Sequence, residues 1–238
     1  MIFNTQVGPT ADPRVRRAIR LAYDYAGGLK AIRLGNGEIA NGPLPAAMPC
    51  RPDLPPIAQD LAGAKQLLKD AGQEKLALKM LYQPQIEVQR QEATLLQSNL
   101  RDIGVELTLE PVTFASYMGM LSKVDTIPQM MLLDDFAQFP DPGAMLFKGF
   151  RSNAVGTNRS GYSNPEVDKI LDAAIATADN DKRCDLYKQA QVIIDADSPQ
   201  MTMYSVGRPV PYRDQQLQPV QVSYVVFPLA PADLRLKN

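Results

Sequence analysis

The spacing of apolar positions predicts alternating strands and helices through the middle of the chain. Apolar residues alternate with polar or small ones over 76–82 and 105–109, as in strands with one solvated face. They recur at helical spacing over 86–103 and 114–121, and a continuous apolar run over 130–133 indicates a buried strand. This order is typical of a sheet covered by helices, so we expect an α/β fold.

Further helices are predicted on both sides of this central unit. Asp12 followed by Pro13 is a favoured helix start, because the first N–H groups of a helix have no intrahelical acceptor. We expect Gly27-Gly28 to interrupt the helical pattern and a second short helix to cover 29–34. Amphipathic spacing predicts more helices over 61–71, 165–178 and 186–194. The remaining stretches are an irregular excursion over 35–56, a strand candidate over 201–206 and an extended tail over 217–227.

The stretch 129–150 carries the candidate chemistry. Its apolar run ends at two carboxylates, Asp134 and Asp135. The loop that follows contains Phe136, Gln138, Phe139 and the turn-forming sequence Asp141-Pro142-Gly143. Because ligands of open α/β sheets bind outside the carboxyl ends of the strands, we expect this strand end to be a binding site.

Charge and histidine content exclude several classes of function. The chain has 25 basic and 26 acidic residues without a broad basic face, so a nucleic-acid partner is not expected. It has no histidine, the commonest general base and zinc ligand, and we predict no metal, cofactor or catalytic residue. The clustered arginines Arg14, Arg16, Arg17 and Arg20 are interpreted as a solvated helix face. The methionines Met118, Met120, Met130 and Met131 are interpreted as core residues.

The cysteines leave two alternatives open. Cys50 and Cys184 lie far apart and show no CxxC spacing, so they form either a disulfide or two unrelated thiols. No stretch approaches the ~20 consecutive apolar residues of a membrane-spanning helix, and the first residues lack the pattern of a secretory signal.

Short motifs follow one another along nearly the whole chain. They are Phe3-Asn4-Thr5, Asp12-Pro13-Arg14-Val15-Arg16-Arg17-Ala18-Ile19, Ala22-Tyr23-Asp24, Gly42-Pro43-Leu44-Pro45, Ala64-Lys65-Gln66-Leu67-Leu68, Ala71-Gly72, Leu96-Gln97, Leu100, Ile103-Gly104-Val105, Asp141-Pro142, Gly161-Tyr162-Ser163-Asn164-Pro165-Glu166-Val167-Asp168, Arg183, Leu186-Tyr187 and Ala190-Gln191. In this order and at these spacings the series resembles the extracellular solute-binding proteins of the dipeptide, oligopeptide and nickel class. These proteins are the binding subunits of ABC importers.

The resemblance implies a lobe of the type II periplasmic-binding-protein fold, with a mixed sheet flanked by helices. Residues 1–200 resemble the second of two lobes, and 201–238 a hinge-crossing strand and a C-terminal segment that returns to the first lobe. We expect a shortened chain rather than a natural single-lobe protein. The implied location is the periplasm, or the cell exterior with a membrane anchor. The implied partners are a small-molecule or short-peptide ligand and a membrane permease, with self-association of the isolated lobe through its apolar cleft face.

The resemblance also adds ligand-binding candidates. Arg90 aligns with a basic position that binds ligand carboxylates in some members, and Tyr82 ends the strand 76–82 as a wall of the cleft. Gln138 occupies the position where peptide-binding members carry an acidic residue, and Asp135 that of an aromatic residue. An amide lacks the charge-assisted bond that a carboxylate forms with an ammonium group, so ordinary dipeptide specificity is in doubt.

Two other functions remain as alternatives. A hydrolase would use paired carboxylates such as Asp134 and Asp141, and it would lose turnover in Asp134→Asn. A stand-alone interaction module would require a natural chain that begins where this sequence begins. A natural protein about twice as long would eliminate that alternative.

Overall fold

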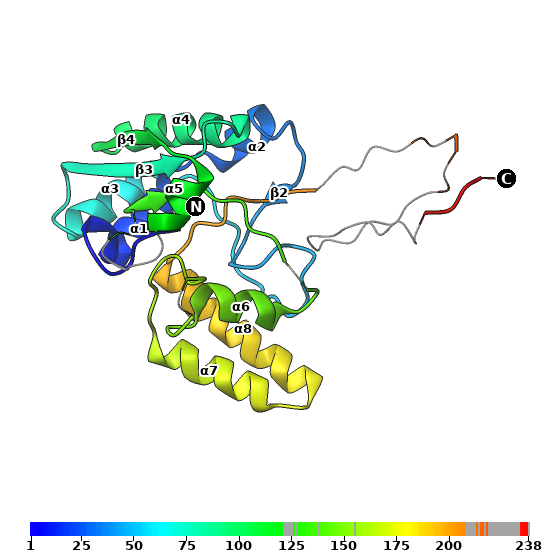
Figure 1. The fold of residues 1–238 in the computed structure, drawn as a ribbon. Helices are drawn as coiled ribbons and strands as arrows, with labels where there is room; N and C mark the ends of the chain where they lie inside the picture. Colours follow the sequence, from blue (N-terminus) through cyan, green and yellow to red (C-terminus); the bar gives the residue numbers. More distant parts are fainter. Residues whose placement is uncertain are drawn as a thin grey trace.

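A mixed sheet lies at the centre of the first half of the fold (Figure 1). The computed structural model describes residues 1–120, 126, 128–137, 139–154, 156–207, 213, 215–216, 218 and 234–237. Its four-stranded sheet has the order β1 (Ile2–Phe3), β5 (Met130–Met131), β3 (Leu76–Tyr82) and β4 (Val105–Pro111). β3 is parallel to β4 and β5, whereas β1 is antiparallel to β5. The predicted strands and the mixed α/β sheet are confirmed.

Helices cover the two faces of the sheet unequally. The helices of this half are α1 (Pro13–Ala22), α2 (Tyr25–Ala31), α3 (Leu61–Asp70), α4 (Glu87–Arg101) and α5 (Phe114–Met120). Leu76, Leu78 and Met80 share one buried cluster with apolar residues of α1, α3 and α4. On the opposite face Ala77 and Lys79 are exposed, and α5 covers only the carboxyl end of the sheet, where Tyr117 packs with Leu81 and Met131. The carboxyl end of the sheet is therefore the part that is enclosed on both faces.

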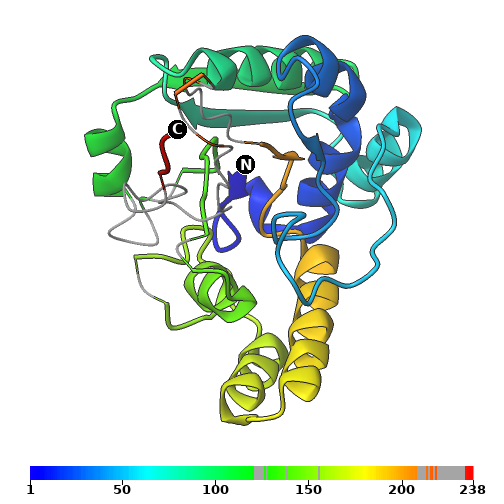
Figure 2. The ribbon, with the colours of Figure 1, turned by 90° about the vertical axis from the view of Figure 1, so that its right-hand side faces the viewer.

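A second core lies below the sheet and consists of helices (Figures 1 and 2). The helices α6 (Pro142–Phe150), α7 (Pro165–Ala176) and α8 (Asn180–Asp197) pack together with Leu44 and Met48 of the excursion. Cys50 and Cys184 form a disulfide with a Cα–Cα distance of 5.0 Å, within the usual range for such a bond. The disulfide alternative is thus the correct one, and it fastens the excursion to α8.

The rest of the excursion is bound to the segment that follows α8. β2 (Glu38–Ile39) pairs antiparallel with β6 (Tyr204–Ser205), which lies within the predicted strand 201–206. A 3₁₀ turn, η1 (Pro9–Ala11), precedes α1. The predicted tail over 217–227 lies almost wholly outside the described residues, and the expected boundary between 200 and 201 stays a prediction.

Side-chain caps define the starts of most of the described α-helices. The Asp12 side chain accepts a hydrogen bond from the Arg14 N–H, and Asn164 caps α7 in the same way. Gly72 follows α3 with φ of +66°, a backbone conformation that costs glycine little. These boundaries follow the sequence prediction closely.

Two of the predicted breaks are wrong. Gly27 and Gly28 do not interrupt a helix but lie inside α2, which Asp24 caps. A Cβ at Gly28 would lie 2.2 Å from the Tyr204 hydroxyl, so this glycine provides room for a neighbouring side chain. Asp141-Pro142-Gly143 is not a turn within a loop: Asp141 is the N-cap of α6, and Pro142 is its first residue.

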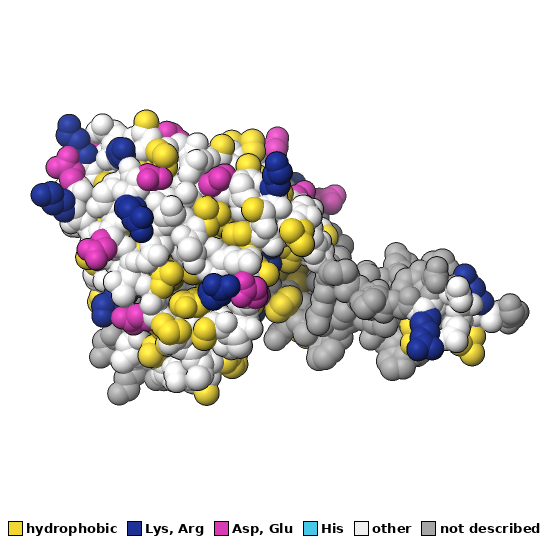
Figure 3. All heavy atoms as spheres, turned by 90° about the horizontal axis from the view of Figure 1, so that it is seen from above, with side chains coloured by type: hydrophobic (Ala, Val, Ile, Leu, Met, Phe, Trp, Pro, Cys, Tyr) yellow, Lys and Arg dark blue, Asp and Glu magenta, His cyan; other side chains and the backbone are white. Residues whose placement is uncertain are grey.

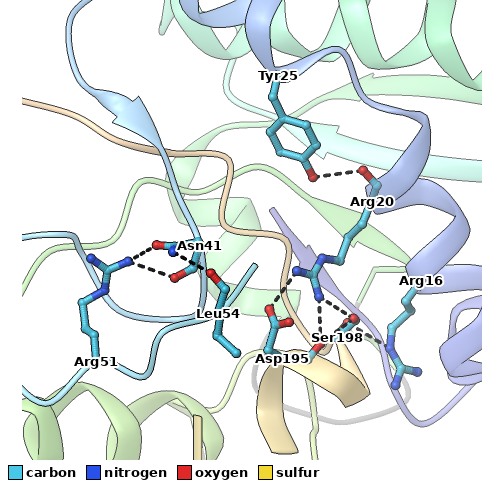
Figure 4. A network of polar contacts seen from close by, with 8 residues as sticks. All are labelled: Arg16, Arg20, Tyr25, Asn41, Arg51, Leu54, Asp195 and Ser198. Atoms are coloured by element: carbon cyan, nitrogen blue, oxygen red, sulfur yellow. Dashed lines mark hydrogen bonds and ion pairs between the residues drawn. The ribbon is translucent and has the colours of Figure 1, made fainter. Parts of the chain in front are cut away.

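Only half of the arginine cluster of α1 is the solvated face that we expected: Arg14 and Arg17 are exposed, whereas Arg16 and Arg20 are not. Only 4% of Arg16 is exposed, and its guanidinium donates hydrogen bonds to the carbonyls of Asp197 and Ser198 at the end of α8. Arg20 donates to the Asp195 carbonyl and forms an ion pair of 2.8 Å with the Asp195 carboxylate (Figure 4). The last carbonyls of a helix lack intrahelical donors, so buried cations are stabilised there.

Candidate functional site

The carboxyl ends of β3 and β5 lie side by side. Met80 pairs with Met130 and Leu81 with Met131, and the Leu132 N–H donates to the Leu81 carbonyl beyond the end of β5. Since both strands run in the same direction, the residues that follow them meet at one edge of the sheet. Asp134 follows β5, and the first turns of α4 follow β3 after a short loop. The expected position of Asp134 at a strand end is confirmed.

Asp134 has polar neighbours from α4 and from the segment that follows α2. Its side chain is 43% exposed, its Oδ2 lies 3.4 Å from the Gln89 amide nitrogen, and its Oδ1 lies 3.9 Å from Arg33 Nη2. Gln89 is buried, and its Oε1 accepts a hydrogen bond from the Gln83 N–H. The hydrogen bond from Gln83, the residue after β3, thus fixes the Gln89 side-chain amide with its nitrogen toward Asp134. The carboxylate is held in place but keeps acceptor capacity toward the solvent.

A buried ion pair lies directly behind Asp134. Arg33 Nε lies 2.8 Å from Glu92 Oε1, and the Glu92 side chain is only 3% exposed. Burial raises the pKa of the Glu92 carboxyl above its ordinary value, while Arg33 acts in the opposite direction. The Arg33 guanidinium also lies over the Tyr204 ring, 5.7 Å from its centroid. Arg33, which follows α2, is therefore fixed by contacts with α4 and β6.

The sequence interpretation missed Arg33, Gln89, Glu92 and Tyr204. The sequence did contain a signal for Gln89 and Glu92. Gln89 falls four residues before Ala93, and Glu92 four residues before Leu96, so both share the buried face of α4. Polar residues on an apolar helix face are candidates for a buried network. Nothing in the local sequence indicates that Arg33 would reach them.

Asp135 and the aromatic residues after it border this cluster. Asp135 Oδ1 lies 2.6 Å from Lys148 Nζ and accepts a hydrogen bond from the Phe136 N–H at 3.0 Å. Phe136 and Phe139 are 48% and 62% exposed. They offer apolar surface beside the carboxylates, as a cleft wall would. Gln138 lies outside the described residues, so its predicted contact with a ligand stays a prediction.

The other predicted ligand contacts do not join the Asp134 cluster. Arg90 Nε and Nη2 donate to the two carboxylate oxygens of Glu87 at 3.0 and 2.5 Å, on the exposed face of α4. Tyr82 is partly buried and packs against the main core. Asp141 accepts a hydrogen bond from the Ala144 N–H at 3.2 Å as the cap of α6, which gives it a structural role.

The predicted core role of the methionines agrees with their placement. Met130 and Met131 are fully buried, and Met118 and Met120 pack partly buried against Met131 and its neighbours. Among the described residues, no group of three or more His, Cys, Asp or Glu side chains is arranged to hold a metal ion. On the face of the molecule in Figure 3, basic side chains lie among acidic ones without forming one basic patch.

Comparison with known proteins identifies the family. Residues 1–157 match the family model described as bacterial extracellular solute-binding proteins, family 5 Middle. The chain belongs to this family. The predicted resemblance is confirmed by a match that covers the four-stranded sheet together with Arg33, Gln89, Glu92 and Asp134.

Individual relatives agree with this assignment. The chain is 30% identical over 197 residues to the probable D,D-dipeptide-binding periplasmic protein DdpA of Escherichia coli (strain K12), covering 82% of this chain and 38% of DdpA. It is 29% identical over 214 residues to the heme-binding protein A of Haemophilus influenzae (strain ATCC 51907 / DSM 11121 / KW20 / Rd), covering 86% of this chain and 39% of that protein. The chain thus spans about two fifths of the length of these relatives.

Solved structures of family members share the fold. HbpA2 from Haemophilus parasuis superimposes with a TM-score of 0.82 at 23% identity, covering 100% of this chain and 47% of HbpA2. The periplasmic binding protein DppA from Helicobacter pylori, solved with the peptide STSA, gives a TM-score of 0.79 at 25% identity, covering 86% of this chain and 40% of DppA. The expected α/β lobe of the type II periplasmic-binding-protein fold is confirmed.

Proposed function

We propose that the complete protein is the substrate-binding component of an ABC importer. It captures a peptide-like or other small polar solute between two lobes and delivers it to a membrane permease. Residues 1–200 form the second lobe, and 201–238 contain the crossing strand and the segment that returns to the first lobe. Hinge closure around the solute produces the form that the permease distinguishes from the open one.

The observation that supports this proposal is the meeting of polar side chains at the carboxyl ends of β3 and β5. Asp134 has free acceptor capacity there, next to the positioned side chains of Gln89 and Arg33. Exposed aromatic residues, Phe136 and Phe139, lie in the loop that follows. A few fixed polar groups beside apolar surface are what a small polar solute requires from its site.

The proposed location is outside the cytoplasm, in the periplasm or on an extracellular membrane anchor. The disulfide between Cys50 and Cys184 supports it, because such bonds persist in oxidising compartments. Two relatives from Escherichia coli (strain K12), DdpA and SapA, are named as periplasmic proteins. Within the described part of the chain, no helix has both the length and the apolar character to cross a bilayer.

A binding function without turnover is favoured over hydrolysis. The family is one of solute-binding proteins, and Asp141 is engaged in capping α6 rather than free to act with Asp134. A hydrolase would show turnover that Asp134→Asn abolishes. Screening the complete protein against peptide and glycoside libraries tests this alternative, and any such turnover would contradict the binding proposal.

Equilibrium binding tests the proposed site. The complete protein is titrated with the solute that co-purifies from its own host, as wild type and as Asp134→Ala, Asp135→Ala and Gln138→Ala. Arg17→Ala is the control, because this side chain is exposed on α1, a helix that supplies none of the three site residues. We expect weaker binding in at least Asp134→Ala. Unchanged affinity in all three site variants would contradict the proposed site.

A further inference from the structure

We infer that Arg33 and Asp134 together bind the head group of an α-amino acid, in which an ammonium and a carboxylate group are attached to the same carbon. This inference rests on the proposed solute-binding function and names the chemical class of the solute. Arg33 would bind the carboxylate of the solute, and Asp134 would bind its ammonium group.

The Arg33 guanidinium is fixed at one of its nitrogens. Its Nε donates to Glu92 Oε1 at 2.8 Å, and its Cζ lies 5.7 Å from the centroid of the Tyr204 ring. Its Nη1 and Nη2 donate no hydrogen bond to any residue that the structure describes, and Asp134 at 3.9 Å from Nη2 lies beyond hydrogen-bonding distance. A guanidinium with its two terminal nitrogens free is suited to a carboxylate.

Arg33 is also positioned before any ligand arrives. Its side chain is 17% exposed, so the ordering of a long flexible side chain has already occurred on folding. The buried Glu92 carboxylate balances its charge from behind. A ligand carboxylate therefore meets a partly buried cation in a fixed orientation, which lowers the entropic cost of binding.

Asp134 provides the complementary charge. Its carboxylate is 43% exposed, and its hydrogen bond from Gln89 is long, 3.4 Å, so its oxygens retain acceptor capacity. Gln89 is buried, and the hydrogen bond from the Gln83 N–H fixes its side chain. The Gln89 amide in turn sets the direction of the Asp134 carboxylate. An ammonium group that binds there gains charge-assisted hydrogen bonds.

The distance between the Arg33 guanidinium and the Asp134 carboxylate favours a solute whose ammonium and carboxylate groups lie on one carbon. Arg33 Nη2 and Asp134 Oδ1 are 3.9 Å apart. An ammonium and a carboxylate on one carbon lie side by side at a comparable spacing. In a peptide each further residue moves the two termini apart by up to about 3.3–3.6 Å. The pair therefore fits a single α-amino-acid head group better than the two ends of a dipeptide.

Charge balance favours a zwitterion over a simple ion. A lone anion at Arg33 would also approach the Asp134 carboxylate, and a lone cation at Asp134 would approach the guanidinium. A zwitterionic head group places each charge beside its opposite. It leaves the net charge of Arg33, Glu92 and Asp134 unchanged.

Arg90, the basic residue indicated by the family resemblance, is less suited to this role. Two of its nitrogens already bind both oxygens of Glu87, and its side chain is 54% exposed on α4. Binding a ligand there would require the Glu87 contact to break or to be shared. Arg90 is consequently the matched control for Arg33.

Calorimetric titration of the complete protein tests the inference. Four probe sets are used. The first is a mixture of the common amino acids in racemic form, and the second and third contain the same amino acids with the amino group acetylated or with the carboxyl group converted to an amide. The fourth contains dialanine and trialanine. Native mass spectrometry of the protein with each mixture identifies the bound species, which is then titrated alone. We expect a free amino acid to bind and both of its blocked forms to bind roughly 10- to 100-fold more weakly, because each lacks one charged group.

Variants connect that preference to the two residues. Arg33→Lys keeps a positive charge near Glu92 but removes the planar donor pair, and Asp134→Asn removes the anion. Each is expected to weaken binding of the free amino acid at least about tenfold, whereas Arg90→Lys leaves it unchanged. Circular dichroism and the melting temperature of each variant establish that it is folded.

The outcomes separate this inference from the proposed function. Binding of peptides but not of free amino acids, with affinity unchanged in Arg33→Lys, would overturn the inference and leave the importer function intact. Equal binding of free and blocked amino acids would also overturn it. If no compound from any of the mixtures binds, the inference is overturned too. The proposed function is then tested separately, by whether a solute co-purifies with the protein from its host.

Discussion

The guanidinium of Arg16 caps the last turn of α8 through the carbonyl of Asp197. Arg16 Nη2 and Nε lie 2.5 and 3.1 Å from this oxygen, although 181 residues separate the two in sequence. Arg16 also donates to the Thr10 and Ala11 carbonyls. α1 belongs to the core of the sheet and α8 to the helical core, so this one side chain connects the two parts of the lobe.

Replacement of Arg16 by Met is expected to destabilise the protein by about 2–4 kcal/mol, because several carbonyls lose their donor in a buried place. Urea denaturation followed by circular dichroism measures the loss. Arg17→Met is the matched control, since the neighbouring side chain is exposed, and it is expected to change the unfolding free energy by less than about 0.5 kcal/mol. Equal effects of the two substitutions would contradict the capping role of Arg16.

The Cys50–Cys184 disulfide is expected to stabilise the lobe by about 2–5 kcal/mol, because it closes a long loop in the unfolded chain. The separation of the two residues is 134 positions. The double variant Cys50→Ser/Cys184→Ser should lower the urea midpoint by the corresponding amount. The wild-type protein should show no free thiol before reduction. A thiol titration that finds two free cysteines in the oxidised protein would contradict the bond.

Glu92 should make stability fall as the pH rises. Burial raises its pKa in the folded state, so the folded protein binds the Glu92 proton more tightly than the unfolded chain does. The unfolding free energy of wild type relative to Glu92→Gln is therefore expected to decrease from the ordinary pKa of the carboxyl, 4.5, up through its raised value. Denaturation of both proteins across this pH range checks the sign. A difference that grows with pH would show that Arg33 outweighs burial.

Much of the fold was predictable because its determinants are local. Asp12 and Asn164 lie beside the N–H groups that they cap, and the alternation over 76–82 gives the strand with its exposed Ala77 and Lys79. The glycines of α2 misled the interpretation because the reason for Gly28 is the Tyr204 hydroxyl, which lies far along the chain. Local sequence does not contain that contact.

Only the Asp134 part of the candidate site could be predicted from the sequence. Asp134 follows an apolar strand, so its place at the edge of the sheet could be inferred. Arg33 and Glu92 meet across 59 positions, and their pairing requires α2 and α4 to be packed first. The arginines of α1 show the same limit, because the acceptors of Arg16 are backbone carbonyls that have no signature in the sequence.

Native mass spectrometry of the complete protein, purified from its own host, is the most direct test of solute binding at Asp134. We expect the wild-type protein to carry a small polar solute as a non-covalent complex, and Asp134→Asn to carry it in a much smaller fraction. Arg17→Met should carry as much as the wild type. A wild-type protein that retains no solute would contradict the proposed binding function, and an Asp134→Asn variant that retains the same solute to the same extent would contradict the proposed site.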